Sequence, residues 1–342
     1  MATKKENRQI VLLTLFAMTL VVAGHSDITT DYKELWIYKW AYSFHMPLFF
    51  FISGFLFCLT NPVEKLHRTT LTAFMKKKTV RLLVPFLFIN TVIFIVKATI
   101  IKDTSMMQHP FNLDLRSFID VTLFHPTGFM WFLPTLFMIF ILAFTIFRYL
   151  KINKLRPQNN IKYAQFLIAS STIIALAILA DMLLPYIAFM QMSRAISYLP
   201  YFFLGILYCE FKNPVDTFIV KYKALVVPVF LTLSVSLMAT GYMAALFGII
   251  FSVAFALILE AKCSDRLVRL ASLCYAVFLL SYFPQMFIRG PIAHRFPEIN
   301  QYIFSATSFV VGLTVPICFG LLFLKLKSKN KTIGRLGTLI GL

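Results

Sequence analysis

The chain has 342 residues, of which 59% are hydrophobic and 14% are charged, with a mean hydropathy of +0.78. Soluble domains average roughly 45–50% apolar and about 25% charged residues, so a soluble fold of this size could not cover its apolar surface. The 33 Lys and Arg against 14 Asp and Glu give a net charge of +19. No basic stretch is interleaved with exposed aromatic residues, which argues against a nucleic-acid partner and leaves the lipid bilayer as the expected environment.

The N-terminal residues Met1–Arg8 are basic and precede an apolar run that ends at Gly24. A cleaved signal peptide begins in the same way. No small-x-small cleavage site follows the run, because it continues into His25-Ser26-Asp27. We therefore expect a retained first helix.

Ten apolar stretches are long enough, or nearly long enough, to cross a bilayer as helices. They cover residues 10–25, 41–60, 82–101, 129–147, 164–186, 196–211, 224–240, 242–259, 270–288 and 302–324. The pattern predicts an all-α, polytopic membrane bundle of about ten transmembrane helices. Residues 1–342 form one membrane domain in this prediction, with residues 1–9 and 325–342 as cytoplasmic tails.

The charged residues predict the orientation of this bundle. With both termini in the cytoplasm, most of the 33 Lys and Arg fall in the cytoplasmic segments, as the positive-inside rule requires. The five cysteines then lie in spans or on the inner side, so we expect no structural disulfide. No C-x-x-C spacing suggests zinc, and we expect no metal.

Histidines mark the ends of the first two stretches. His25 closes the first span beside Ser26 and Asp27, and His45 lies early in the second span, two residues before Pro47. Ionisable groups in such places are functional candidates, and a neutral imidazole can accept a proton from a hydroxyl. We expect His25 to be a catalytic base that Asp27 orients. An interfacial role for His25 and a structural role for His45 remain alternatives, since Pro47 frees backbone carbonyls nearby.

Ser53 and Gly54 follow four consecutive apolar residues inside the second span. Glycine there permits close helix approach, and Ser53 is either a packing residue or a contact to substrate. No G-x-S-x-G context marks it as a nucleophile.

A basic run, from Lys76 to Arg81, precedes the third span. Lys78 and Arg81 are three residues apart and share a helix face, so both can reach one anionic cofactor, with Lys77 beside them. The alternative is that the run only anchors the span to anionic lipid.

Two further candidates lie near outer span ends. Trp131 opens the fourth span, where an aromatic belt is one explanation and a substrate contact another. Arg194 precedes the sixth span and could line a polar groove for an acceptor.

These features resemble the acyltransferase-3 family of bacterial integral membrane acyltransferases over most of the chain. The most specific likeness is the string Phe44-His45-Met46-Pro47-Leu48-Phe49-Phe50-Phe51-Ile52-Ser53-Gly54-Phe55. Others are Leu20-Val21-Val22-Ala23-Gly24-His25, Arg81-Leu82-Leu83-Val84-Pro85, Trp131-Phe132-Leu133, Leu199-Pro200-Tyr201-Phe202-Phe203-Leu204-Gly205 and Ser272-Leu273-Cys274-Tyr275-Ala276-Val277-Phe278-Leu279.

The resemblance implies an O-acyltransferase that moves an acetyl or similar short acyl group from cytoplasmic acyl-CoA to a carbohydrate hydroxyl at the outer face of the inner (plasma) membrane. It implies that His25 matches the family's essential histidine. It also implies that Lys78 and Arg81 match a pair of arginines, one of which is Lys here. Lys keeps the charge but loses the bidentate fork of Arg.

The chain departs from the family pattern in two places. Leu12 and Thr14 stand where an acidic and a basic residue are usual, and residues 274–281 lack the histidine that ends a late family motif. The departures keep two alternatives open, which are a transporter of a lipid-linked glycan and a catalytically inactive membrane scaffold. The spans carry few charges apart from Lys97 and Asp181, which disfavours transport.

The predicted topology can be tested with reporter fusions. Reporters placed after Arg156 and after Leu342 are expected in the cytoplasm, and one near Asp114 is expected outside, because Lys and Arg concentrate in the inner segments. Protease protection or reporter activity in intact cells measures this directly. An external C-terminus contradicts the ten-span prediction.

Overall fold

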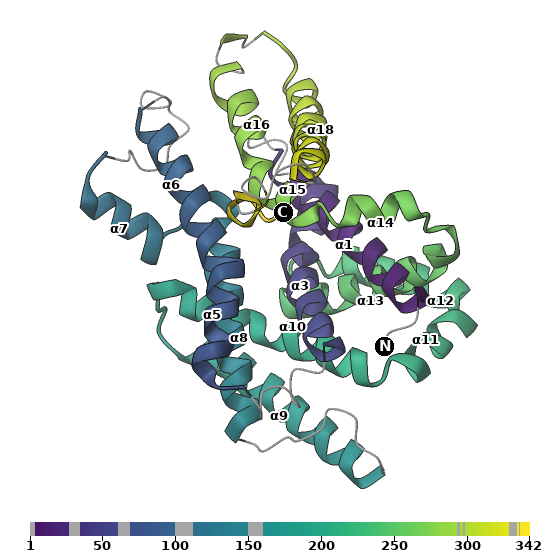
Figure 1. The fold of residues 1–342 in the computed structure, drawn as a ribbon. Coiled ribbons are helices and arrows are strands. Elements are labelled where there is room, and N and C mark those ends of the chain that lie inside the picture. Colours follow the sequence, from purple (N-terminus) through teal and green to yellow (C-terminus); the bar gives the residue numbers. More distant parts are fainter. Residues whose placement is uncertain are drawn as a thin grey trace.

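The computed structural model describes residues 4–26, 35–60, 69–99, 112–149, 160–292, 295, 296, 298–327, 334 and 336–342. These residues form helices and short connections, with no strand among them. The α-helices are α1 (Lys4–Gly24), α3 (Trp36–Leu59), α5 (Leu71–Lys78), α6 (Val84–Thr99), α7 (Leu115–Leu123), α8 (Phe132–Tyr149), α9 (Asn160–Leu183), α10 (Met192–Glu210), α11 (Lys212–Lys221), α12 (Lys223–Ser236), α13 (Tyr242–Leu259), α14 (Asp265–Ala271), α15 (Cys274–Leu280), α16 (Tyr282–Phe287) and α18 (Gln301–Lys327) (Figure 1). The all-α class predicted from the sequence is confirmed for this part of the chain.

Six helical segments of the described chain are long and apolar enough to cross a membrane. They are Trp36–Leu59, Leu71–Thr99, Gly128–Arg148, Ala164–Leu183, Tyr242–Lys262 and Gln301–Lys327. Two bent pairs, α11 with α12 at 98° and α14 with α15 and α16 at 42°, raise the number to eight if each pair is one span. The predicted stretches 10–25 and 196–211 form α1 and α10, which are not among these eight. The chain is therefore a multi-pass membrane protein, and ten spans and cytoplasmic termini remain predictions.

Helix α3 lies in the middle of the bundle, where it packs against α1, α10 and α13 (Figure 1). Most of its length is buried, because its apolar residues extend around the helix and neighbours cover them. Helices α9 and α18 are more apolar than α3 but mostly exposed, as expected for helices that face lipid. Side chains on α3 are thus the best placed to line an internal site.

Helices α3 and α10 touch backbone to backbone. A Cβ atom added to Gly54 would lie 1.9 Å from the Phe202 carbonyl oxygen, and one added to Gly205 would lie 2.0 Å from the Phe51 carbonyl oxygen. The contact is reciprocal, since each glycine meets the residue three positions before the other glycine. Only glycine allows this approach. The predicted packing role of Gly54 is explained by this contact.

We predict that Gly54→Ala strongly destabilises the protein. The methyl group would meet backbone atoms, which cannot rotate away, so α3 and α10 must separate at a cost of about 1–3 kcal/mol or more. The midpoint of thermal unfolding of the detergent-purified protein measures this loss. Gly334→Ala is the control, because a Cβ there meets only the Lys327 side chain at 3.6 Å. Equal midpoints for the two variants contradict the prediction.

Candidate active site

His25 lies one residue beyond the end of α1, in a partly buried aromatic setting. Its ring centroid is 5.1 Å from that of Phe129 and 6.2 Å from that of Tyr42. A Cβ on Gly24 would come within 2.7 Å of the Tyr42 ring, so this glycine lets the tyrosine pack against the end of α1. The sequence at 24 and 25 therefore places an imidazole beside a tyrosine of α3.

His45 packs against the same tyrosine, with 4.7 Å between the ring centroids of Tyr42 and His45. Its Nδ1 atom is 3.0 Å from the carbonyl oxygen of Ala41, and the side chain is buried. A carbonyl can only accept a hydrogen bond, so Nδ1 carries the proton and Nε2 is left as an acceptor. The structure thus brings the two predicted histidines together through Tyr42. It also gives His45 a bond to a backbone carbonyl, although this is the carbonyl of Ala41 and not that of Ser43, the residue four positions before Pro47.

The end of α1 is tied to α16 by a buried amide. Gln285 donates through Nε2 to the Val22 carbonyl oxygen at 2.9 Å and to the Ser26 hydroxyl at 3.0 Å. The Ser26 hydroxyl in turn donates to Val22 O at 2.6 Å. A Cβ on Gly312 of α18 would overlap Gln285, so this glycine makes room for the amide. These bonds fix the backbone on both sides of His25.

A second buried amide holds the short helix η2 (Gly128–Trp131), which supplies Phe129. Asn90 of α6 donates to Val121 O at 3.0 Å and accepts from the Thr127 hydroxyl at 2.8 Å. Thr127 immediately precedes η2, as its N-cap residue. Asn90 therefore positions the helix that contacts His25.

A cavity lies further along α1 and α3 from the two histidines. Its volume of about 340 Å³ is within the size range of small-molecule sites. Two cations, Lys78 and Arg81, line it together with hydroxyl groups and many apolar side chains. The complete lining is Thr14, Met18, Phe49, Ile52, Ser53, Leu56, Phe57, Thr60, Lys78, Arg81, Leu82, Phe132, Leu133, Leu136, Phe140, Cys274, Tyr275 and Phe278. Lys77 is exposed and is not part of the lining.

The cations enter this cavity from an irregular helix. Residues Thr79–Leu83 form a π-helical turn, η1, in which the Val84 backbone N–H donates to Thr79 O. Such turns are rare and are often found at functional sites. The Lys78 Nζ atom lies 3.4 Å from the centroid of the Phe140 ring, and the Tyr275 hydroxyl donates to Arg81 O at 2.7 Å. An aromatic ring therefore contacts the Lys78 cation, and a tyrosine fixes the backbone of Arg81 at the cavity wall.

The cavity and the histidines are stacked along the same helices. On α3, His45 precedes the lining residue Phe49 by one turn, and on α1, His25 follows the lining residue Met18 by about 10 Å of helix. Two rings of the cavity lining, Phe132 and Phe278, connect it to Phe129, which contacts His25; the centroid separations are 4.9 Å for Phe129 and Phe278 and 5.3 Å for Phe132 and Phe278. The phenylalanines divide a charged cavity from an imidazole pair.

Trp131 and Arg194 are also neighbours. The Arg194 guanidinium carbon lies 4.5 Å from the centroid of the Trp131 ring, and Trp131 stacks on Tyr198 at 5.5 Å. Ser197 follows Arg194 by three residues on α10, and its hydroxyl donates to the Asp181 carboxylate. Asp181 also accepts a hydrogen bond from the Tyr242 hydroxyl at 2.7 Å. These residues form an aromatic and polar group at the other end of η2 from Phe129.

The predicted residues thus fall into three groups. His25 and His45 lie together, Lys78, Arg81 and Ser53 line one cavity, and Trp131 contacts Arg194. Asp27 lies outside the described residues. Sequence reasoning missed Tyr42 and Gln285. Gln285 could have been found in the sequence as a lone amide in an otherwise apolar span. Such an amide needs hydrogen-bond partners inside the bundle.

Comparison with known proteins gives one family. The model of the acyltransferase domain of the acyltransferase-3 family matches residues 9–324. No curated protein and no solved structure gave a match. The matched range runs from α1 to α18 and contains every described residue of the three groups above. The chain therefore belongs to the acyltransferase-3 family and is a multi-pass membrane protein with an acyltransferase domain.

Proposed function

We propose that this protein moves an acetyl or similar short acyl group from cytoplasmic acyl-CoA to a hydroxyl of a cell-surface or exported carbohydrate. The observation that carries this proposal is that the cavity lined by Lys78 and Arg81 and the pair of His25 and His45 follow one another along α1 and α3. The cations suit the phosphates of an acyl-CoA, and the apolar lining suits its uncharged arm. The histidines supply the base that attack on its thioester requires.

The donor enters the cavity with its phosphates at the cationic wall. Lys78 and Arg81 bind phosphate oxygens through charge-assisted bonds, which are the strong class of hydrogen bond. The aromatic and aliphatic walls contributed by α3 and α8 suit the uncharged arm that carries the thioester. Ser53 lines the same wall, so it contacts the donor in this proposal.

The transfer step takes place at the top of the cavity. His25 accepts the proton of the acceptor hydroxyl, the oxygen attacks the thioester carbonyl, and the C–S bond breaks as the tetrahedral intermediate collapses. The thiolate of the released coenzyme then takes the proton from the imidazolium. Asp27 orients His25, and His45 is the alternative base through its Nε2. The Phe129, Phe132 and Phe278 rings must rotate for the thioester to reach His25.

In this proposal, two cations that contact the Tyr282 ring supply the positive charge that stabilises the developing oxyanion. Lys97 Nζ and the Arg289 guanidinium lie 5.6 Å and 5.8 Å from the centroid of the Tyr282 ring. That ring is 5.5 Å from Phe129, which contacts His25. Fixed cations beside developing negative charge lower the barrier because they need no reorganisation.

The acceptor binds along η2. The flat faces of Trp131 and Tyr198 suit the apolar face of a sugar ring, and Arg194 and Asp181 offer hydrogen bonds to its hydroxyl groups. One end of η2 then binds the carbohydrate while the other places Phe129 against His25. The orientation predicted from the charged loops puts this acceptor group outside the inner membrane and the donor cavity inside, where acyl-CoA is made.

The donor prediction concerns the two cavity cations. Lys78→Ala or Arg81→Ala removes one charge-assisted phosphate contact worth roughly 1.5–3 kcal/mol, so the acyl-CoA concentration for half-maximal rate rises about ten- to a hundredfold. Acyl transfer from labelled acetyl-CoA by purified protein measures this. Lys76→Ala is the matched control, since it removes the same charge from an exposed position of the run. Unchanged acyl-CoA saturation in both cavity variants means that the run is only a topology anchor.

The base prediction concerns His25. Removing a positioned base costs about 10²–10⁴ in rate, whereas an imidazole that only faces headgroups is replaced by water. We expect His25→Ala and His25→Gln to insert and bind acyl-CoA but not to acylate the carbohydrate. His125→Gln is the control, because His125 is exposed and pairs with Asp120 instead. Near-normal acylation by both His25 variants would falsify the assignment and make His45 the next candidate.

A further inference from the structure

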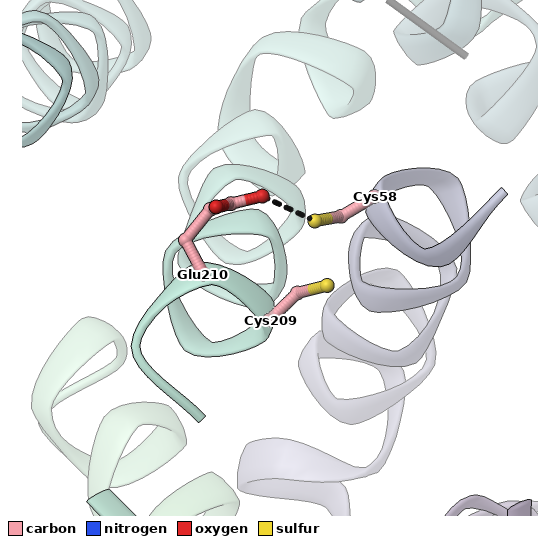
Figure 2. A group of neighbouring side chains, drawn as sticks. All are labelled: Cys58, Cys209 and Glu210. Atoms are coloured by element: carbon pink, nitrogen blue, oxygen red, sulfur yellow. Dashed lines mark hydrogen bonds between the residues drawn. The ribbon is translucent and has the colours of Figure 1, made fainter. Parts of the chain in front are cut away.

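Three side chains of types that can bind a metal meet at the ends of α3 and α10, away from the histidines. Figure 2 shows Cys209 and Glu210 on α10 beside Cys58 on α3. The ligand atoms of all three lie within 4.8 Å of one another, and the Cys58 thiol donates to Glu210 Oε1 at 3.1 Å. Cys58 is buried and the other two are partly buried. This is the one such group among the described residues.

The meeting of the two thiols follows from the glycine contact between the helices. Cys58 is four residues after Gly54, and Cys209 is four residues after Gly205, so each thiol lies one helical turn beyond its glycine. The two segments share the pattern F-x-x-G-x-L-[F/Y]-C, from Phe51 and from Phe202. The backbone contact that brings the glycines together therefore brings the cysteines together, and the residue after the second cysteine supplies the carboxylate.

The donor set fits zinc better than other common ions. Zn²⁺ takes cysteine sulfur at about 2.3 Å and carboxylate oxygen at about 2.0–2.2 Å in a tetrahedron, which puts neighbouring ligand atoms roughly 3.5–3.8 Å apart. The three atoms here lie within 4.8 Å of one another, so side-chain rotations can bring them to that separation. Two thiolates exclude Mg²⁺ and Ca²⁺, which require oxygen ligands.

We propose that Cys58, Cys209 and Glu210 bind one Zn²⁺ ion, with a fourth position left for water. As the two Zn–S bonds form, both thiols release their protons to solvent, so affinity falls as the pH falls. The ion clips α3 to α10 next to Leu56, Phe57 and Thr60, which line the donor cavity. No C-x-x-C spacing indicated this site in the sequence, because its ligands come from helices that are distant in sequence.

The experiment uses the full-length protein in detergent with a phosphine reductant. Titration with Co²⁺, which replaces Zn²⁺ and absorbs strongly when thiolate binds, is expected to show one equivalent with a thiolate-to-cobalt band that Zn²⁺ displaces. Cys58→Ser and Cys209→Ser lose the band, and Glu210→Gln weakens binding. Cys318→Ser is the matched control, since Cys318 is an exposed cysteine of α18. This readout does not depend on acyltransferase activity.

Three results overturn the proposal. One is the absence of stoichiometric Co²⁺ or Zn²⁺ binding by the folded wild-type protein. Another is a band that survives in the double variant Cys58→Ser/Cys209→Ser. The third is a Cys58–Cys209 disulfide in protein purified under reducing conditions, detected as a mass lower by two hydrogens, because a disulfide leaves no thiolate for a metal.

Discussion

The backbone contact between Gly54 and Gly205 is the constraint on which the other features of this bundle depend. Because each glycine meets a carbonyl of the opposite helix, α3 and α10 are fixed relative to each other at that level. Everything on α3 is thereby positioned, from Tyr42 and His45 at one end to Cys58 at the other. In a membrane there is little hydrophobic driving force between helices, so close backbone packing of this kind supplies much of the association energy.

A second constraint is the cost of placing polar groups inside an apolar bundle. In the candidate site, the polar groups are gathered in two places, the cation pair of the cavity and the histidine pair. Phenylalanine rings connect the two. Buried amides satisfy the backbone where the helices end, as Asn90 and Gln285 do at η2 and α1.

Local sequence patterns predicted the helical class and several of the candidate residues that the structure brings together. The three-residue spacing of Lys78 and Arg81 predicted one shared surface, and both line the same cavity even though the helix there is a π-helical turn. Residue type and position in a span identified His25. These features are local, because helical periodicity and the cost of burying an ionisable group act within a few residues.

Contacts between distant segments could not be predicted in this way. The bond from Gln285 to Val22 joins residues 263 positions apart, and no pattern in either segment names the other. The same holds for Tyr42, which brings His25 and His45 together, and for the exclusion of Lys77 from the cavity. Local hydropathy also could not settle the number of spans, because it does not reveal bends such as the 98° angle between α11 and α12.

The central claim is that the donor site and the acceptor site lie on opposite sides of one membrane, with His25 at the junction. Sealed inside-out membrane vesicles that carry the native carbohydrate test it most directly. Labelled acetyl-CoA supplied only to the exposed cytoplasmic face should label carbohydrate inside the vesicles. Labelling that requires acetyl-CoA in the lumen, or that is equal when His25 is Gln, would contradict the account.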